Sequence, residues 1–332
     1  MVKYVIKRLL LSIFILLGVS IILYTLVRIM PVDFLRDKAV AIVGSSGADP
    51  DELYQKLCEA YGLTDKTFAG LCKGYWSWLK NFIQGDFGDS WKYNQPVKEA
   101  IFKNMPISFG ISFVSLILQL LIAIPLGIKC ACNQYGKLDY FATVLTMIGI
   151  SFPTFFLGSL LIKFFAIDLG WFEIGGLISS LPKDATTFTK IVNVAWHLVL
   201  PMFLLTVLSI GAWLRYTRTN TLEVLNADYI RTARAKGLSE NSVVYKHVFR
   251  NTLIPLVTLL AGTLPSLFSG AMITETIFDL PGVGNMAYQA MLVGDIPFIM
   301  TYNMFIAVLT VIGILLTDVM YAVVDPRVKL GD

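Results

Sequence analysis

The hydrophobic positions of this chain gather in six long runs separated by polar segments. The runs lie at residues 9–29, 107–126, 140–165, 194–213, 253–273 and 298–321. Each reaches the length of about 20 residues that an α-helix needs to cross the hydrocarbon core of a bilayer. A soluble core would contain one or two such runs, but not six. The pattern therefore predicts an all-α polytopic membrane protein with six transmembrane helices.

The composition agrees with this prediction. Of 332 residues, 56% are hydrophobic and only 15% are charged, whereas a soluble domain carries about 25% charged residues. The first run follows Lys3, Lys7 and Arg8, as a signal peptide would. It is longer than a signal sequence's apolar region and no small-residue cleavage site follows it, so we expect it to remain as the first membrane helix.

The basic residues of the short loops predict the orientation, because cytoplasmic loops are enriched in Lys and Arg. The segment 214–252 contains seven of them, whereas 166–193 contains two and 274–297 contains none. We therefore expect both termini to lie in the cytoplasm. The net charge of +4 indicates no nucleic-acid partner, since these basic residues sit where membrane topology places them.

The segment 30–106 between the first two runs is too long for a simple loop, and we expect it to be helical and extracytoplasmic. One helix is predicted over 49–61. Another is predicted over 68–83, where Cys72, Trp76, Leu79 and Ile83 share one face at helical spacing.

Cys58 and Cys72 lie on these two predicted helices, each seven residues from Asp65. In an antiparallel hairpin they would face each other, and a disulfide there would stabilise the fold by roughly 3 kcal/mol. The alternative is two small buried thiols that never meet. We expect Cys130 and Cys132 on the cytoplasmic side, where thiols stay reduced.

The sequence lacks the motifs of an enzyme or a metal site. It contains no G-x-x-x-x-G-K-[ST] phosphate loop, and His197 and His247 have no Cys or carboxylate at ligand spacing. Arg28, Lys163 and Asp318 lie near span ends, where we expect interfacial anchors. We therefore predict no catalytic residue, metal or cofactor, and no buried relay for ion-coupled transport. If the chain transports, its energy must come from another subunit.

The segment 214–252 predicts two short helices with a sharp joint. Asp228 can cap a first helix that runs through Lys236. Gly237 suits the left-handed position after a helix, with Leu238 packing back.

The second helix of this segment would be capped by Ser239 and begin at Glu240. It would place three valines and His247 on neighbouring faces. On the first helix, the small side chains of Ala233 and Ala235 would allow another protein to approach closely. Such a basic hairpin can either lie on anionic headgroups or dock to another protein.

A family resemblance favours docking. The stretch Arg231-Thr-Ala-Arg-Ala-Lys-Gly237 resembles the coupling motif of permeases in ATP-binding-cassette (ABC) importers, in the form of the dipeptide and oligopeptide branch. The wider superfamily ends this motif in Ile-x-Leu-Pro. Here the positions read His247-Val-Phe-Arg250 and the proline comes at Pro255, which is similar to the peptide branch.

Further motifs, in the same order and spacing, resemble the first of the two peptide permease subunits along the whole chain. They are Lys7-Arg-Leu-Leu10, Gly18-Val-Ser-Ile-Ile22, Arg28-Ile-Met-Pro31, Tyr61-Gly-Leu-Thr64, Gly85-Asp-Phe-Gly-Asp-Ser90, Phe152-Pro-Thr-Phe-Phe156, Glu275-Thr-Ile-Phe-Asp-Leu-Pro-Gly-Val-Gly284 and Asp325-Pro-Arg327.

The resemblance implies a type I ABC importer permease in a bacterial or archaeal inner membrane. Its implied partners are a homologous second permease, two cytoplasmic ATPases that bind ATP and Mg, and an extracytoplasmic peptide-binding protein. The residues implied to couple to the ATPase are Asp228, Arg231, Thr232, Ala233, Arg234, Ala235, Lys236, Gly237, Leu238 and His247.

The implied division of the chain is a first helix at 1–29, an extracytoplasmic segment at 30–106, a membrane core at 107–321 and a tail at 322–332. Gly262, Pro265 and Ser269 would either bend the fifth span and line the pathway or serve ordinary helix packing. Other readings remain: an importer of nickel, glutathione or oligosaccharide, or a membrane sensor that does not transport.

Overall fold

The computed structural model describes residues 2–29, 36, 39–40, 49–60, 67–182 and 184–324. Several predicted features lie outside these residues: the motifs at 61–64 and 325–327, Pro31, Lys183, and the tail beyond residue 324.

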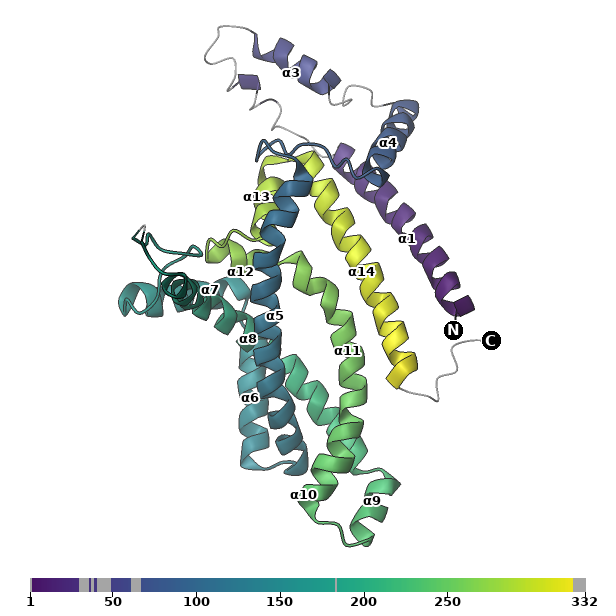
Figure 1. Cartoon of the computed structure of the whole chain (residues 1–332), viewed down its shortest axis with the longest axis vertical. Coiled ribbons are helices and arrows are strands. Elements are labelled where there is room, and N and C mark those ends of the chain that lie inside the picture. The colour runs from purple at the N-terminus through teal and green to yellow at the C-terminus, as the bar shows by residue number, and fades with distance from the viewer. Residues whose placement is uncertain are drawn as a thin grey trace. The chain divides into compact units, whose positions relative to one another are not determined.

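The described residues form helices and no β-strand, which confirms the all-α prediction (Figure 1). The elements are α1 Val2–Ile29, α3 Pro50–Ala60, α4 Phe68–Ile83, α5 Val97–Cys132, α6 Lys137–Ser151, α7 Thr154–Leu161, π-helix η1 Ile162–Asp168, α8 Thr187–Leu225, α9 Asp228–Ala235, α10 Glu240–Ser242, π-helix η2 Val243–Val248, α11 Phe249–Ser269, α12 Met272–Ile277, α13 Val283–Val293 and α14 Ile296–Val324.

Five stretches of helix in the described residues are long and apolar enough to cross a membrane: within α1, α5, α8, α11 with α12, and α14. The remaining predicted span, the third along the chain, is a pair of helices, Lys137–Ser151 and Thr154–Asp168, bent by 100°. The expectation of one unbroken helix over 140–165 is therefore wrong. Pro153 lacks an N–H and forces the preceding residue out of the helical region, and Phe152 takes φ −80° and ψ 130°.

The chain divides into two compact units. The first contains Met1–Met105 and Met286–Val311, and the second contains Pro106–Asn285 and Ile312–Asp332. All three boundaries fall inside helices α5, α13 and α14. This explains why the sequence shows no linker. The division expected from the sequence stays a prediction.

In the first unit, α4 packs against α1. Tyr75 Oη lies 2.8 Å from Ser20 Oγ, and the Tyr75 ring stands edge-on to Tyr24 with centroids 5.6 Å apart. The four residues that share one face by helical spacing are not buried together. Leu79 is buried, but Trp76 and Ile83 are exposed. The helix is apolar over more than half its circumference, so spacing alone did not select the packed side.

The structure does not contain the predicted disulfide between Cys58 and Cys72. Cys58 and Cys72 are both free thiols. Tyr75 and Trp78 turn α4 toward α1, and Cys72 is left exposed on another side of the helix. The prediction of a bridge assumed an antiparallel hairpin of the two outer helices, and the contacts of α4 are made with α1 instead.

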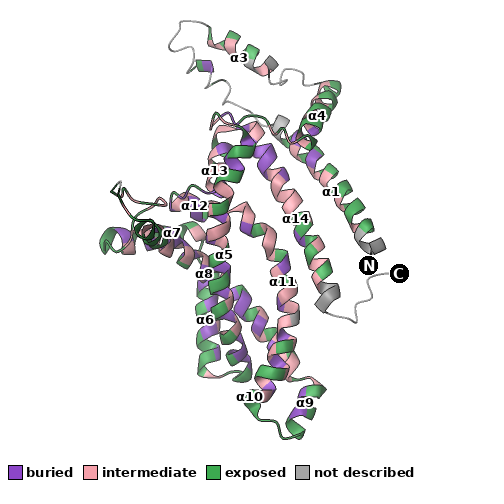
Figure 2. Cartoon of the chain, in the orientation of Figure 1, coloured by how far each residue is buried: buried purple, intermediate pink, exposed green. Residues whose placement is uncertain are grey.

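The second unit is built on close helix packing around α8. A Cβ on Gly211 would lie 2.8 Å from Ile150 Cδ1 of α6, and one on Gly127 would lie 2.8 Å from Thr217 Cβ. These glycines let α6 and α5 approach α8 with no side chain between. Figure 2 shows the result: α5 and α8 carry many buried residues, whereas α1 is mostly exposed.

Candidate functional site

A cavity of about 670 Å³ lies in the second unit, lined by residues of α5, α6, α8 and α11 and by Gly270 and Ala271 beyond α11. None of its 17 described lining residues is charged. Its polar lining residues are Ser112, Ser115, Gln119, Ser209, Tyr216, Thr263 and Ser266. The cavity is therefore apolar in its framework, with hydroxyl and amide groups spread over its wall.

Two polar groups of α5 show how this wall is arranged. Gln119 Nε2 donates to the Leu205 carbonyl of α8 at 3.2 Å, which holds its amide across the helix contact. The Ser115 hydroxyl is buried and has no hydrogen-bond partner among the described residues. A buried hydroxyl without a partner is costly, so a water or a guest molecule in the cavity would be stabilised there.

The three residues proposed from sequence to line a pathway lie beside this cavity and are not among its described lining residues. A Cβ on Gly262 would lie 3.7 Å from Thr317 Oγ1, and Pro265 meets Gly313 so closely that a Cβ there would clash. Ser269 Oγ donates to the Ser266 carbonyl at 3.0 Å. The face of α11 toward the cavity carries Thr263 and Ser266 instead, and Gly262 and Pro265 serve packing against α14.

The hairpin after α8 has its own small core. Ile230 and Ala233 of α9 are buried against Val243 and Val248 of η2, with residues 224 and 225 of α8 packed beside them. Ile230 and Ala233 are three residues apart and so lie on one helix face. The hairpin thus folds as a compact module on the end of α8.

The joint of this module agrees with the sequence analysis. Gly237 has φ +77°, and its N–H donates to the Arg234 carbonyl at 2.9 Å. Ser239 caps α10, accepting from the Ser242 N–H at 3.4 Å. Across the joint, the Arg234 guanidinium binds both carboxylate oxygens of Glu240, at 2.8 and 3.2 Å.

Three details of the module correct the sequence analysis. Asp228 does not cap α9: Ala227 occupies the N-cap, and Asp228 is the first helical residue, where its charge favours the helix dipole. Ala233 faces the core of the module rather than the surface. Leu238 stays 41% exposed instead of packing back. The other implied coupling residues of α9 and the joint are exposed, and His247 is half-buried.

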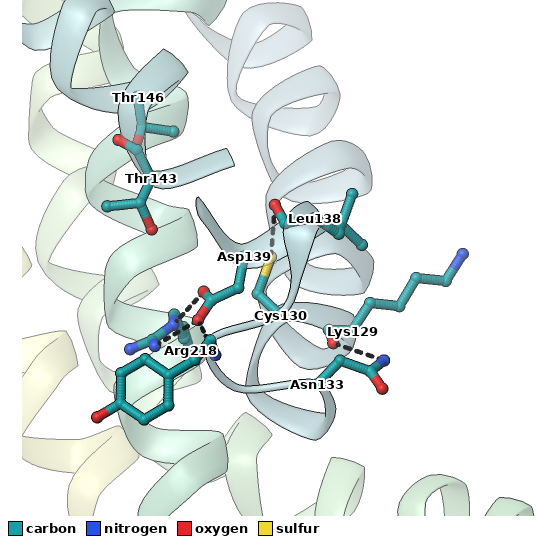
Figure 3. A network of polar contacts seen from close by, with 9 residues as sticks. Lys129, Cys130, Asn133, Leu138, Asp139, Thr143, Thr146 and Arg218 are labelled. Atoms are coloured by element: carbon teal, nitrogen blue, oxygen red, sulfur yellow. Dashed lines mark hydrogen bonds and ion pairs between the residues drawn. The ribbon is translucent and has the colours of Figure 1, made fainter. Parts of the chain in front are cut away.

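An ion pair between α6 and α8 was not foreseen (Figure 3). Arg218 Nε and Nη2 donate to Asp139 Oδ1 and Oδ2 at 2.6 and 2.7 Å, and Asp139 Oδ2 also accepts from the Tyr135 N–H at 3.0 Å. The Asp139 side chain is 5% exposed and that of Arg218 is 23% exposed. The pair fastens the α5–α6 turn to the part of α8 that leads into the hairpin module.

A second unforeseen feature is Glu275 of α12, which is completely buried. Its Oε1 accepts from the Ala271 N–H and its Oε2 from the Asn285 N–H, both at 3.0 Å. A Cβ on Gly270 would lie 2.8 Å from Oε1, and one on Gly282 would clash with the carboxylate. Since Ala271 lines the cavity, Glu275 fixes one edge of the cavity wall.

The sequence carried a signal for only one of these features. Glu275 and Gly282 belong to a stretch quoted above as a family motif, and the structure supplies its physical reason: the glycines leave room for the carboxylate. Asp139 and Arg218 are 79 residues apart, and nothing local links them.

Comparison with known proteins identifies the family. Residues 123–330 match the family model described as "Binding-protein-dependent transport system inner membrane component". The chain is 39% identical to the "Oligopeptide transport system permease protein AppB" of Bacillus subtilis over 99% of this chain and 100% of that protein. It is 31% identical to the "Dipeptide transport system permease protein DppB" of Alkalihalophilus pseudofirmus over 99% and 100%.

A solved structure supports the fold. The chain resembles a permease chain of the MetNI methionine ABC transporter in its inward facing conformations, with a TM-score of 0.53 and 19% identity. The match covers 68% of this chain and 96% of that chain. The chain therefore belongs to the family of binding-protein-dependent inner membrane transport components, as one of the peptide ABC importer permeases.

Proposed function

We propose that the cavity of the second unit is part of the path by which di- and oligopeptides cross the membrane. Two observations together support this proposal. The chain is similar over its full length to an oligopeptide permease, and none of the described residues that line the cavity is charged. As a member of a binding-protein-dependent family, the chain works with ATPase and binding-protein partners and is not itself catalytic.

The chemistry of the wall suits a varied peptide cargo. A path must bind its cargo weakly enough to release it, and a fixed charge would hold oppositely charged peptides. Hydroxyls such as those of Ser112, Ser115 and Ser266 can bond the amides that all peptides share. The 17 described lining residues include no His, Cys, Asp or Glu, the side chains that a nickel ion would favour.

The hairpin module is the proposed contact with a cytoplasmic ATPase. Its core is closed, so the module can be pushed as one body, while Arg231, Lys236 and Tyr245 are exposed and available to a partner. The complete importer would contain a homologous second permease and two ATPases, with the binding protein on the opposite side of the membrane.

The test of the path uses the whole transporter reconstituted in liposomes with labelled di- to hexapeptides. Ser266→Trp places a bulky side chain on an exposed position of the cavity wall and should reduce uptake at least tenfold, while ATP hydrolysis continues. Ser266→Ala leaves the space open and should transport at nearly the normal rate. Uptake by Ser266→Trp at the normal rate would exclude this cavity from the path.

The proposed orientation has a separate test. In a chain without native cysteines, Asn241→Cys lies in the hairpin module and Ser180→Cys in the loop before α8, both exposed. An impermeant thiol reagent outside intact cells should label Ser180→Cys and reach Asn241→Cys only after the membrane is opened. The reverse pattern would invert the topology.

A further inference from the structure

On the apolar face of α4, the described residues cover Leu79 but leave four other positions uncovered. Phe68, Trp76 and Ile83 are 83%, 70% and 76% exposed, and Cys72 is exposed between them. At 100° per residue these four positions fall within about 80° of one another around the helix. Lys73 follows on the adjacent side, so the apolar face borders a polar one.

The neighbouring side of α4 shows at what depth the helix lies. It contacts α1 through Tyr75 and Trp78: Tyr75 Oη is 2.8 Å from Ser20 Oγ, and the Trp78 ring is 6.1 Å from that of Tyr24. The apolar span of α1 ends at Leu26. Ser20 is six residues inside this end, which corresponds to about 9 Å below the edge of the span.

The C-terminal end of α4 lies at a similar depth beside another span of the first unit. Phe82 lines a cavity of about 220 Å³ together with Phe102, Thr301 and Phe305. The apolar span of α14 begins at Ile296. Thr301 and Phe305 therefore lie about 8 and 14 Å inside it. Two independent contacts thus place α4 alongside membrane spans rather than beyond their ends.

We propose that α4 is embedded in the membrane leaflet beside the C-terminal end of α1, and that its uncovered apolar face contacts lipid. The helix against which α4 packs also exposes apolar side chains: on α1, Phe14 is 76% and Ile22 is 60% exposed. Trp side chains such as that of Trp76 are favoured near the lipid headgroups. Lys73 can extend its ammonium group from the border of this face to the headgroup region.

The experiment uses Cys72, which lies on the proposed lipid face. Cys58, Cys130 and Cys132 are replaced by serine, a nitroxide is attached to Cys72, and the complete transporter is reconstituted in liposomes. Collision with oxygen, which concentrates in lipid, should exceed collision with a water-soluble nickel chelate at least fivefold. A label on Trp76→Cys in place of Cys72 should behave in the same way.

A label on Ser77→Cys, on the polar side of α4, is the matched control and should collide more with the nickel chelate. Preferred collision of the Cys72 label with the nickel chelate would show that water covers this face. Low collision with both reagents would show that a protein partner covers it. Either result would overturn the proposal.

Discussion

The two ends of the second unit are held by different chemistry. Ser108 and Gly127 lie near these ends on α5, nineteen residues or about 28 Å apart. Near Ser108, whose Oγ accepts from the Val283 N–H at 2.8 Å, the buried carboxylate of Glu275 is bonded to backbone N–H groups. Near Gly127, the ion pair of Arg218 joins side chains of two helices.

This difference suggests how the unit moves. Backbone N–H groups and glycines around Glu275 leave no space for another arrangement, so we expect the α11–α12 break to move as a rigid piece. Ion pairs between side chains can follow a displacement of the helices that carry them. We therefore expect the end that leads into the hairpin module to accommodate motion. The variants below test this difference and are ordered from the largest expected loss of stability to the smallest.

The largest loss of stability is expected from Gly282→Ala. The added Cβ would clash with the carboxylate of Glu275 and lie 2.6 Å from Ser108 Oγ. The carboxylate would have to leave its backbone donors, and overpacking of this kind costs about 3 kcal/mol. We expect a lower melting temperature of the purified transporter, measured by the loss of its monodisperse peak after heating.

Gly262→Ala is the control for this variant. It adds the same methyl group to a helix position where the nearest atom, Thr317 Oγ1, is 3.7 Å away. Its melting temperature should equal or exceed that of the unmodified chain. If Gly282→Ala melts like the control, the cage around Glu275 is not rigid and the comparison fails.

The second-largest loss of stability is expected from Asp139→Asn. It removes the negative partner of Arg218, whose side chain is only 23% exposed. Removing one member of a buried pair costs about 3 kcal/mol, and the partial exposure of Arg218 makes about 2 kcal/mol a reasonable expectation here. The same thermal assay measures the loss.

The double variant Asp139→Leu with Arg218→Met tests whether the pair itself is needed. Apolar replacement of both partners avoids an unpaired charge and often restores stability. We expect melting close to that of the unmodified chain, with slower uptake if the charges guide the motion. Equal loss in the single and double variants would mean that the charges matter for reasons other than pairing.

These features show where sequence reasoning succeeds. Membrane spans were predictable because lipid demands about 20 consecutive apolar residues, a local signal. The joint of the hairpin module was predictable because Gly237 and Ser239 each act on their own backbone. One local signal was overlooked: Pro153 restricts Phe152 and breaks the third span.

The remaining features depend on partners far away in the chain. Asp139 needs Arg218, and Tyr75 needs Ser20, so neither contact follows from spacing along one helix. The disulfide prediction failed for the same reason, because it assumed a hairpin partner for α4 that only tertiary packing could decide. Cys72 is exposed because α4 packs against α1 through other residues.

The third prediction concerns the joint at Gly237. A Cβ there would meet no atom within 4 Å, so a substitution acts only through the φ of +77°. Gly237→Val should cost about 1–2 kcal/mol locally and misalign α9 with α10. We expect normal membrane insertion and continued ATP hydrolysis, but several-fold slower peptide uptake by the reconstituted transporter.

Gly237→Asn separates conformation from the mere loss of glycine. Asparagine tolerates the left-handed region better than other residues with a side chain, so it should retain most of the uptake. Uptake by Gly237→Val at the normal rate would show that the joint does not transmit motion.

The smallest effect on stability is expected from Arg234→Ala, which breaks the pair with Glu240. These side chains are 42% and 66% exposed, and exposed pairs contribute about 0.2–1 kcal/mol. The melting temperature should hardly change, so a strong loss of uptake would point to a contact of Arg234 with the ATPase. The exchange Arg234→Glu with Glu240→Arg decides between the roles: it rebuilds the internal pair but inverts the charge presented to a partner. Recovered uptake in the exchange variant would assign Arg234 to the joint itself, and continued loss would assign it to the ATPase contact.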